Sequence, residues 1–405
     1  MFHKDLARRS FLKTGLLAAP LSSALVNPGM AKEKGRAAGP KGHPGPSKPK
    51  LTLNVREFGA TGDGATKDTA AIQQTIDRCW VLGGGEALVP AGNYLTGAIA
   101  LRSNTVLRLD QDAIIRGTPD FADYPVTQVR WEGNWIQGRL GLIYALDAAH
   151  IGVVGPGKII GNSALSGRPN AQNPLRHPSL IEPIGCHDVR FEDFSTEYHV
   201  MWCLHATYCE NVVFKNLTIH STGGNADGID IDSCRHVLID GCDISTGDDC
   251  IAIKSGRGAF IEDIVASDLD VAGTRGGFLR FNILNSGIQD QAPVPGDEGI
   301  PTIKNFRFSN VRVADCPILV DGTGIHPHKP LEGFSLVNVT GTCAKGISLA
   351  NIRKAEIRNI KVTGYSGPLL SISNVTGKGL EGATTIEPLK LPDPVPPPAK
   401  PYQLH

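Results

Sequence analysis

Short runs of alternating apolar and polar residues recur along the chain and predict β-strands. Three runs begin at Cys186, Cys209 and Cys234, so their starts lie 23 and 25 residues apart. Each continues with a turn-like polar pair, a valine and then phenylalanine or isoleucine. Weaker copies occupy residues 304–308, 333–336 and 354–357. A period in the low twenties with strands and no helices predicts a parallel β-solenoid. A β-sandwich would explain the strands but not the recurring Cys-x-x-Val heads.

One helical pattern stands near the start of the apolar-periodic region. Ile72, Ile76 and Cys79 fall at helical spacing, and Asp68 can cap the residues that follow it. We expect this helix to cover the open end of the solenoid, whose backbone edge would otherwise be exposed.

The first 31 residues have the character of an export signal. Arg8 and Arg9 precede an apolar stretch from about Thr14 to Val26, and the paired arginines indicate the twin-arginine type. That stretch is shorter than the ~20 residues of a membrane-spanning helix, and no other segment is long and apolar enough to cross a bilayer. We therefore expect a periplasmic or secreted protein, the alternative being that this segment is a helix of the folded domain.

Composition divides the remainder of the chain. Residues 32–50 consist largely of lysine, glycine and proline and predict a linker, and residues 387–405 form a proline-rich tail. Residues 51–386 are expected to form one parallel β-helix domain.

Charge and cysteine content exclude several classes of protein. Forty basic and 40 acidic side chains give a net charge of zero, which argues against a nucleic-acid-binding protein. The nine cysteines are odd in number and are not spaced like those of a small disulfide-rich scaffold. Because free cysteine is among the most buried residue types, we favour buried thiols over disulfide bridges.

Two loops carry carboxylates in matching positions. When residues 225–231 are shifted by 22 onto residues 247–253, the isoleucines of the two segments coincide. With these isoleucines facing inward, Asp227 and Asp249 lie on the outward side, about one strand spacing apart. Asp248 joins them only where the backbone bends, and Gly247 makes a bend inexpensive.

Three close carboxylates suit the hydrolysis of a glycosidic bond. Like charges raise the pKa of at least one group, so that an acid and a base can coexist near neutral pH. That reaction needs an acid for the leaving oxygen and a base for water. Aspartates next to glycine also cap strands as ordinary turn residues, and clustered aspartates can bind calcium. The match of both loops favours a catalytic site.

The motifs resemble those of glycoside hydrolase family 28, the polygalacturonase-like pectin hydrolases, over nearly all of residues 51–386. The matching segments are Phe58–Gly64, Pro90–Tyr94, Asn225–Gly228 and, most specifically, Gly247–Cys250. The resemblance implies a right-handed parallel β-helix.

The resemblance also implies a reaction. It is an inverting hydrolysis of α-1,4-linked galacturonic acid, with Asp248 as general acid while Asp227 and Asp249 hold and activate water. We expect a polysaccharide or oligosaccharide substrate, no cofactor, no metal ion, no nucleic-acid partner and a monomer.

The chain departs from the family in one region. The family follows its Asp-Asp block with a Gly-His-Gly block and then an Arg-x-Lys block. No histidine occurs between Asp249 and His326, as if about two coils were missing. Lys254 then stands for the family lysine that holds the sugar carboxylate, and Ala252 takes the place of the arginine.

Further candidate substrate-binding residues follow from the repeat. Aligning the cysteine heads places Trp202 beneath Asp227 and His205 beneath Asp230, where a sugar-stacking ring and a polar contact make sense. A tryptophan packed under a loop is an equal alternative. Arg275 and Arg280 lie one coil beyond the aspartates and are candidates to replace the missing cations, although arginines are more often simply solvated.

Two functional alternatives remain open. Loss of the histidine block favours a non-catalytic β-helix that binds acidic polysaccharide, and the incomplete carboxylate clamp favours a hydrolase of a neutral or rhamnose-containing polymer. His326 and His328 lie in one turn, but two histidines without further ligands do not predict a metal site.

Overall fold

A computed structural model describes residues 51–131, 134–165, 174–198, 201–221, 225–255, 260–272, 277–283 and 296–391. The expected export signal, the linker and most of the tail lie outside these residues. In the part described, no helix has the length and apolar character needed to span a membrane.

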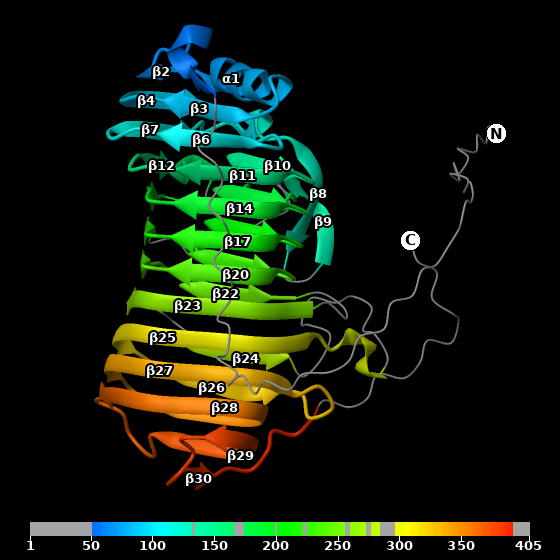
Figure 1. Cartoon of the computed structure of the whole chain (residues 1–405), viewed down its shortest axis with the longest axis vertical. Coiled ribbons are helices and arrows are strands. Elements are labelled where there is room, and N and C mark those ends of the chain that lie inside the picture. Colours follow the sequence, from blue (N-terminus) through cyan, green and yellow to red (C-terminus); the bar gives the residue numbers. More distant parts are fainter. Residues whose placement is uncertain are drawn as a thin grey trace, which may run out of the picture. The chain divides into compact units, whose positions relative to one another are not determined.

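The chain forms stacked coils of parallel strands that run from α1 (Thr69–Val81) to β30 (Thr384–Thr385), as Figure 1 shows. The larger sheet contains β1 (Thr52–Asn54), β2 (Asp63–Lys67), β3 (Gly85–Val89), β4 (Gly92–Thr96), β6 (Thr105–Leu109), β7 (Ala113–Gly117), β11 (Ala149–Val154), β12 (Lys158–Ile160), β14 (His187–Glu192), β15 (Ser195–Glu197), β17 (Glu210–Lys215), β18 (Thr218–His220), β20 (Arg235–Asp240), β21 (Asp243–Ser245), β23 (Phe260–Ala272), β24 (Leu279–Ile283), β25 (Thr302–Cys316), β26 (Val320–Ile325), β27 (Leu331–Cys343), β28 (Ile347–Thr363), β29 (Leu370–Lys378) and β30. All pairings within it are parallel, as a β-helix requires.

A second parallel sheet carries the predicted site loops. Its order is β22 (Ile251–Lys254), β19 (Ile229–Asp232), β16 (Leu204–Thr207), β13 (Ile181–Ile184), β10 (Ile143–Leu146) and β5 (Ile99–Ala100). A separate antiparallel hairpin consists of β8 (Val126–Trp131) and β9 (Asn134–Arg139), and short 3-10 helices are η1 (Val55–Phe58), η2 (Phe121–Asp123), η3 (Ser163–Leu165) and η4 (Gly296–Gly299).

The strand register confirms the predicted repeat. Val189 pairs with Val212, and Val212 pairs with Val237, so the three cysteine-headed runs occupy successive coils. Of the weaker copies, Phe306 pairs with Phe334, and the third copy pairs onto the second in the same way. Identical positions therefore stack through the core, which burial of apolar surface stabilises.

The corners of the coils show why polar residues follow the cysteines. Asp188, Asn211, His236, Asp263 and Asn305 occupy one position in successive coils, and each has φ between 54° and 58°. Asn and Asp tolerate this left-handed conformation better than most residues. Neighbouring side chains also bond to each other, as when Asn211 Nδ2 donates to Asp188 Oδ1 at 3.0 Å.

The predicted buried thiols are confirmed. All nine cysteines are free and buried. Within the column formed by Cys186, Cys209 and Cys234, the backbone N–H of Cys209 donates to Cys234 Sγ at 3.3 Å. Burial of Cys209 raises the pKa of its thiol well above the ordinary value. These cysteines therefore pack as small apolar residues.

The predicted helix is present as α1, with one correction to its cap. Ile72, Ile76 and Cys79 are fully buried against the first coils, and α1 contacts η1 and β3. Asp68 is the N-cap residue, but its side chain makes no cap hydrogen bond. Instead its carboxylate accepts from the backbone N–H of Thr61 at 2.7 Å and of Gly62 at 3.0 Å, and so fixes the preceding loop.

Candidate active site

The two aspartate loops stack as the sequence predicts. Ile229 pairs with Ile251, and Ile231 pairs with Ile253 across β19 and β22. Just before the strands, Gly228 N–H donates to the carbonyl of Asp249 at 2.9 Å. Asp227 and Asp249 therefore occupy equivalent positions on adjacent coils.

Asp248 joins this pair through a bend in the backbone. The chain bends at Gly247 and Asp248 rather than continuing as a strand. The Asp248 carboxylate turns back to the previous coil and accepts from the backbone N–H of Asn225 at 3.1 Å. Its negative charge also acts on Asp249. The expected gathering of three carboxylates is present, and we call Asp227, Asp230, Asp248 and Asp249 the carboxylate cluster.

Lys254 neutralises part of the carboxylate cluster. Its ammonium donates to Asp227 Oδ2 at 2.8 Å and also to Asp230 Oδ1, and it lies 4.2 Å from the ring centre of Trp202. Burial works against the charge of Lys254, but Asp230 and Asp227 outweigh it and raise its pKa above the ordinary value. Lys254 was predicted to hold a sugar carboxylate, whereas the structure uses it as the counter-ion of two aspartates.

Asp230 is the least hydrated member of the cluster. Its side chain is fully buried, and burial together with the charge of Asp227 raises its pKa well above the ordinary value despite Lys254. Its Oδ2 has no hydrogen-bond partner among the described residues. One lysine thus faces two carboxylates, which crowd each other at this position.

Asp249 differs from Asp230 because solvent reaches it. Partial loss of hydration raises its pKa above the ordinary value, and the charges of Asp227 and Asp248 add to this effect. Lys254 and Arg280 oppose the shift. A carboxylate that binds its proton more tightly than usual is a better general base, and Asp249 is also accessible to a ligand.

Arg280 lies where the sequence analysis placed it. It belongs to β24, the corresponding strand of the next coil, and its charge acts on Asp249. Its side chain is 63% exposed, and its Nε lies 3.5 Å from Asp321 Oδ2 on β26. Arg280 is therefore a cation beside the carboxylate cluster that a ligand can reach. The other candidate, Arg275, lies outside the described residues.

Trp202 and His205 lie beneath Asp227 and Asp230, as predicted, but their side chains are buried and not exposed to a substrate. His205 pairs with Asp230, and Cys203 N–H donates to the carbonyl of Asp227 at 2.8 Å, so the alignment of the coils holds. However, Trp202 is 2% exposed and His205 is fully buried. Neither side chain offers a free surface to a sugar.

The hairpin β8–β9, which the sequence analysis missed, explains this burial. Trp131 of β8 contacts the Trp202 ring edge-on at 6.5 Å, and Arg130 Nε donates to Asp232 Oδ2 at 3.2 Å. Figure 1 shows β8 and β9 beside the coil stack. Two runs with β-branched and aromatic residues, at 126–131 and 134–139 and separated by Glu132-Gly133, are the sequence signal that could have predicted it.

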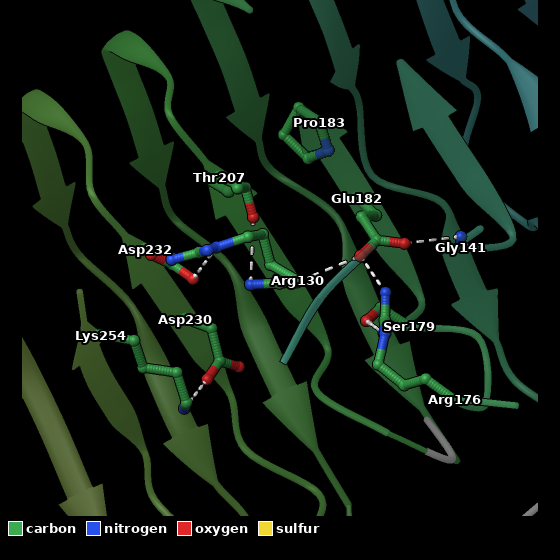
Figure 2. Close-up of polar contacts among 12 residues, drawn as sticks. Arg130, Gly141, Arg176, Ser179, Glu182, Pro183, Thr207, Asp230, Asp232 and Lys254 are labelled. Atoms are coloured by element: carbon green, nitrogen blue, oxygen red, sulfur yellow. Dashed lines mark hydrogen bonds and ion pairs between the residues drawn. The ribbon is translucent and has the colours of Figure 1, made fainter. Parts of the chain in front are cut away.

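A buried network of paired charges includes Arg130 of the hairpin (Figure 2). Arg176 donates to Glu182 Oε1, and Gly141 N–H donates to Glu182 Oε2 at 3.0 Å. Nδ1 of His205 lies 3.2 Å from Glu182 Oε1, and its Nε2 lies 3.2 Å from the Thr207 hydroxyl. Together with Arg130 and Asp232, the residues Arg176, Glu182 and His205 are called the paired network below.

Charge balance fixes the protonation of the paired network. Burial opposes the charge of Glu182, but Arg176, His205 and the Gly141 N–H together outweigh it and lower the pKa of Glu182 below the ordinary value. Burial lowers the pKa of His205, and Glu182 opposes this only in part. The network therefore consists of an ionised carboxylate, an arginine and a neutral imidazole, which is a positioning arrangement and not a substrate surface.

Comparison with known proteins relates the site segment to one family. The profile of glycosyl hydrolases family 28 matches residues 81–274, which include both aspartate loops. This chain is similar to the polygalacturonases of glycoside hydrolase family 28. The suspected resemblance is thereby confirmed.

Two curated relatives illustrate the extent of the similarity. A probable polygalacturonase of Vitis vinifera is 31% identical over 220 residues, which is 51% of this chain and 44% of that protein. The exo-poly-alpha-D-galacturonosidase of Dickeya chrysanthemi is 28% identical over 51% of this chain and 42% of its own length. This polygalacturonase-like chain thus matches less than half the length of these relatives.

A solved structure shares the fold of this chain. The hyperthermoactive exopolygalacturonase from Thermotoga maritima superimposes with a TM-score of 0.57, over 84% of this chain and 86% of that one, at 24% identity. The predicted right-handed parallel β-helix is confirmed by this similarity.

Proposed function

We propose that this protein is a pectin-degrading glycoside hydrolase that cleaves α-1,4-linked galacturonic acid in pectin or oligogalacturonides with inversion. The observation that carries the proposal is the stacking of Asp227 and Asp249, with Asp248 bent towards them, inside the segment that matches family 28. Carboxylates at two stacked loops supply an acid and a base on one face.

In the proposed reaction Asp248 is the general acid. It donates its proton to the glycosidic oxygen as the bond from that oxygen to the anomeric carbon breaks. A water molecule attacks the anomeric carbon from the opposite side and passes its proton to Asp249, whose raised pKa favours proton acceptance. One water is consumed for each bond cleaved, and the two aspartates exchange their protons with solvent before the next turnover.

Asp227 orients the attacking water in this proposal. Asp227 is 4% exposed, and Lys254 fixes its carboxylate at 2.8 Å. Asp230 accepts from the same ammonium through its Oδ1. Lys254 and Asp230 are then positioning residues that act through Asp227.

Arg280 is our candidate for holding the substrate carboxylate. Lys254 is already bonded to two aspartates, whereas Arg280 is exposed and lies on the neighbouring coil. A guanidinium can bind a carboxylate through two parallel hydrogen bonds. Its contact with Asp321 is long enough for a substrate carboxylate to compete for it.

We also propose that the protein works outside the cytoplasm as a monomer. The proposal rests on the paired arginines and the apolar run within residues 1–31. Fusion of residues 1–31 to a reporter, with Arg8 and Arg9 both changed to lysine as control, tests export, and light scattering tests the oligomeric state. A reporter that stays inside the cell with the unchanged segment contradicts the export proposal.

The deciding experiment measures release of reducing ends from polygalacturonate, rhamnogalacturonan and a neutral glycan. We expect release from polygalacturonate, lowered about 10²–10⁴-fold in Asp248→Asn. Asp243→Asn is the matched control, because Asp243 is an exposed aspartate of the same coil at the start of β21. Proton NMR of the first product tests inversion at the anomeric carbon.

The main alternative is a β-helix that binds acidic polysaccharide without cleaving it. The sequence between Asp249 and His326 has no histidine, and β22 is the terminal strand of the six-stranded sheet. Saturable binding of polygalacturonate without turnover supports this alternative and contradicts the hydrolase. Turnover of rhamnogalacturonan or the neutral glycan alone instead redirects the substrate proposal.

A further inference from the structure

A cluster of potential metal ligands lies at the far end of β26, away from the carboxylate cluster. His326 directly follows β26, and His328 comes two residues later in the same turn. Asp297 belongs to η4 and contributes the third side chain. The sequence offered two histidines without a further ligand, and only the fold brings the aspartate to them.

The three side chains converge closely. One ligand atom from each of Asp297, His326 and His328 lies within 4.8 Å of the others. His328 Nδ1 is 3.1 Å from Asp297 Oδ1, and the two imidazole rings are 4.8 Å apart. In the part of the chain that the structure describes, no other three histidine, cysteine or carboxylate ligands meet this condition.

The backbone around the cluster is held by several hydrogen bonds. Lys329 N–H donates to the carbonyl of His326 at 3.2 Å, and Ile300 N–H donates to that of Asp297 at 3.2 Å. The Lys329 ammonium donates to the carbonyl of Ile300 at 2.6 Å and so links the turn to the segment after η4. The ligands are therefore brought together by two segments that are already fastened to each other.

One hydrogen bond at His326 must give way to a metal. His326 is 7% exposed, and its Nδ1 accepts from the backbone N–H of His328 at 3.2 Å, so an ion bound at Nδ1 displaces this contact. Neutral imidazole and ionised carboxylate are the forms that bind metals.

We propose that Asp297, His326 and His328 bind a divalent transition-metal ion, with Zn²⁺ as the preferred ion. Two imidazoles and one carboxylate suit zinc, whereas calcium and magnesium prefer oxygen ligands alone. A tetrahedral zinc site places its ligand atoms about 3.4 Å apart, and the His328–Asp297 contact is already close to this spacing. The ion takes the proton's place between these two side chains and releases that proton to solvent.

The site leaves a fourth ligand position for water, because Asp297 and His328 are both exposed. Lys329 is a nearby positive charge that weakens binding, but its ammonium is engaged by Ile300. About five residues of strand, or roughly 16 Å, separate His326 from Asp321, the partner of Arg280. The metal would therefore link η4 to the turn after β26, and its binding would not depend on the hydrolytic site.

The test uses the mature, untagged protein stripped of metal with a chelator. Zn²⁺ titrated by calorimetry is expected to bind at one equivalent with a Kd below about 10 µM. Co²⁺ should give the visible absorption of a low-symmetry nitrogen and oxygen site. Binding should also raise the midpoint of thermal unfolding.

Three variants decide the location of the metal. His328→Ala and Asp297→Asn are expected to weaken Zn²⁺ binding at least tenfold, and neither substitution removes a buried side chain. His187→Ala is the matched control, because His150 and His187 each lie 3.2 Å from Asp188 in an exposed cluster of the same composition. We expect His187→Ala to bind Zn²⁺ like the unchanged protein.

Two outcomes overturn the proposal. One is the absence of saturable Zn²⁺ binding below about 100 µM. The other is a loss of binding in His187→Ala with unchanged binding in His328→Ala, which would place the metal at the other cluster.

Discussion

The paired network and the carboxylate cluster occupy the same sheet, yet they treat buried charge in opposite ways. In the paired network, Glu182 has Arg176 and Asp232 has Arg130, and these four side chains are at most 4% exposed. In the carboxylate cluster, Lys254 pairs with two of the four aspartates and its charge reaches Asp249, with Arg280 nearby on the next coil.

The difference follows from access to water. Under the hairpin β8–β9 no solvent can screen a charge, so each carboxylate must have a cation. At β22 the sheet ends, and Asp249 is open to solvent. Uncompensated negative charge is tolerated there, which is how functional sites commonly differ from structural ones.

The largest expected effect comes from Asp249→Asn in the carboxylate cluster. Removing the proposed base should lower kcat/KM on polygalacturonate about 10²–10⁴-fold. The midpoint of thermal unfolding should stay unchanged or rise, because a crowded negative charge is removed. Reducing-end assays measure kcat/KM, and calorimetry measures the unfolding midpoint. A variant that is active but less stable would show that Asp249 serves stability and not catalysis.

The next effect concerns Arg176→Met in the paired network. Glu182 would remain buried without its cation, so the free energy of unfolding should fall by about 3–5 kcal/mol. Chemical denaturation measures this change. Arg312→Met is the control, because the exposed Arg312–Asp270 pair should contribute less than about 1 kcal/mol. Equal decreases in the free energy of unfolding in both variants would show that burial does not determine how much an ion pair contributes to stability.

A smaller effect on kcat/KM is expected from Lys254→Met. This variant tests both regions' logic, because Lys254 is a partly buried ion-pair partner and also a positioning residue of the carboxylate cluster. Lys254 holds the pKa of Asp249 down against its other neighbours, so its loss should raise that pKa further. The base form of Asp249 then persists only at higher pH, and the acidic limb of the kcat/KM profile should move upward. Lys254→Arg should restore part of the profile, whereas an unshifted limb in both variants contradicts a positioning role.

The smallest effect is the pH dependence of stability due to His205. Its pKa in the folded state lies below the ordinary value, so below about pH 6.5 the unfolded chain binds a proton that the folded protein does not. Stability is therefore lost as the pH falls, by at most about 1.4 kcal/mol per pH unit. Denaturation at pH 7.5 and 5.5 should show a smaller difference in His205→Gln than in the unchanged protein.

Much of the carboxylate cluster could be predicted because it is a property of the repeat. A shift of 22 residues places Asp227 over Asp249, and a parallel stack preserves this register through every coil. The bend at Asp248 was predicted from Gly247. The partners of Lys254 were not predicted, because Asp230 and Lys254 lie two residues out of register, at positions paired with Ala252 and Asp232.

The sequence by itself determined what repeats: the strand period, the stacked isoleucines, the buried thiols and the two aspartate loops. These features depend on residues that are neighbours one coil apart. The alternation of apolar and polar residues and the length of the repeat therefore predict them from the sequence. Only the tertiary structure decided which outward positions are covered. The hairpin β8–β9 packs against Trp202, and η4 brings Asp297 to His326. Both contacts involve segments outside the repeat. No sequence periodicity predicts which residues these segments contact.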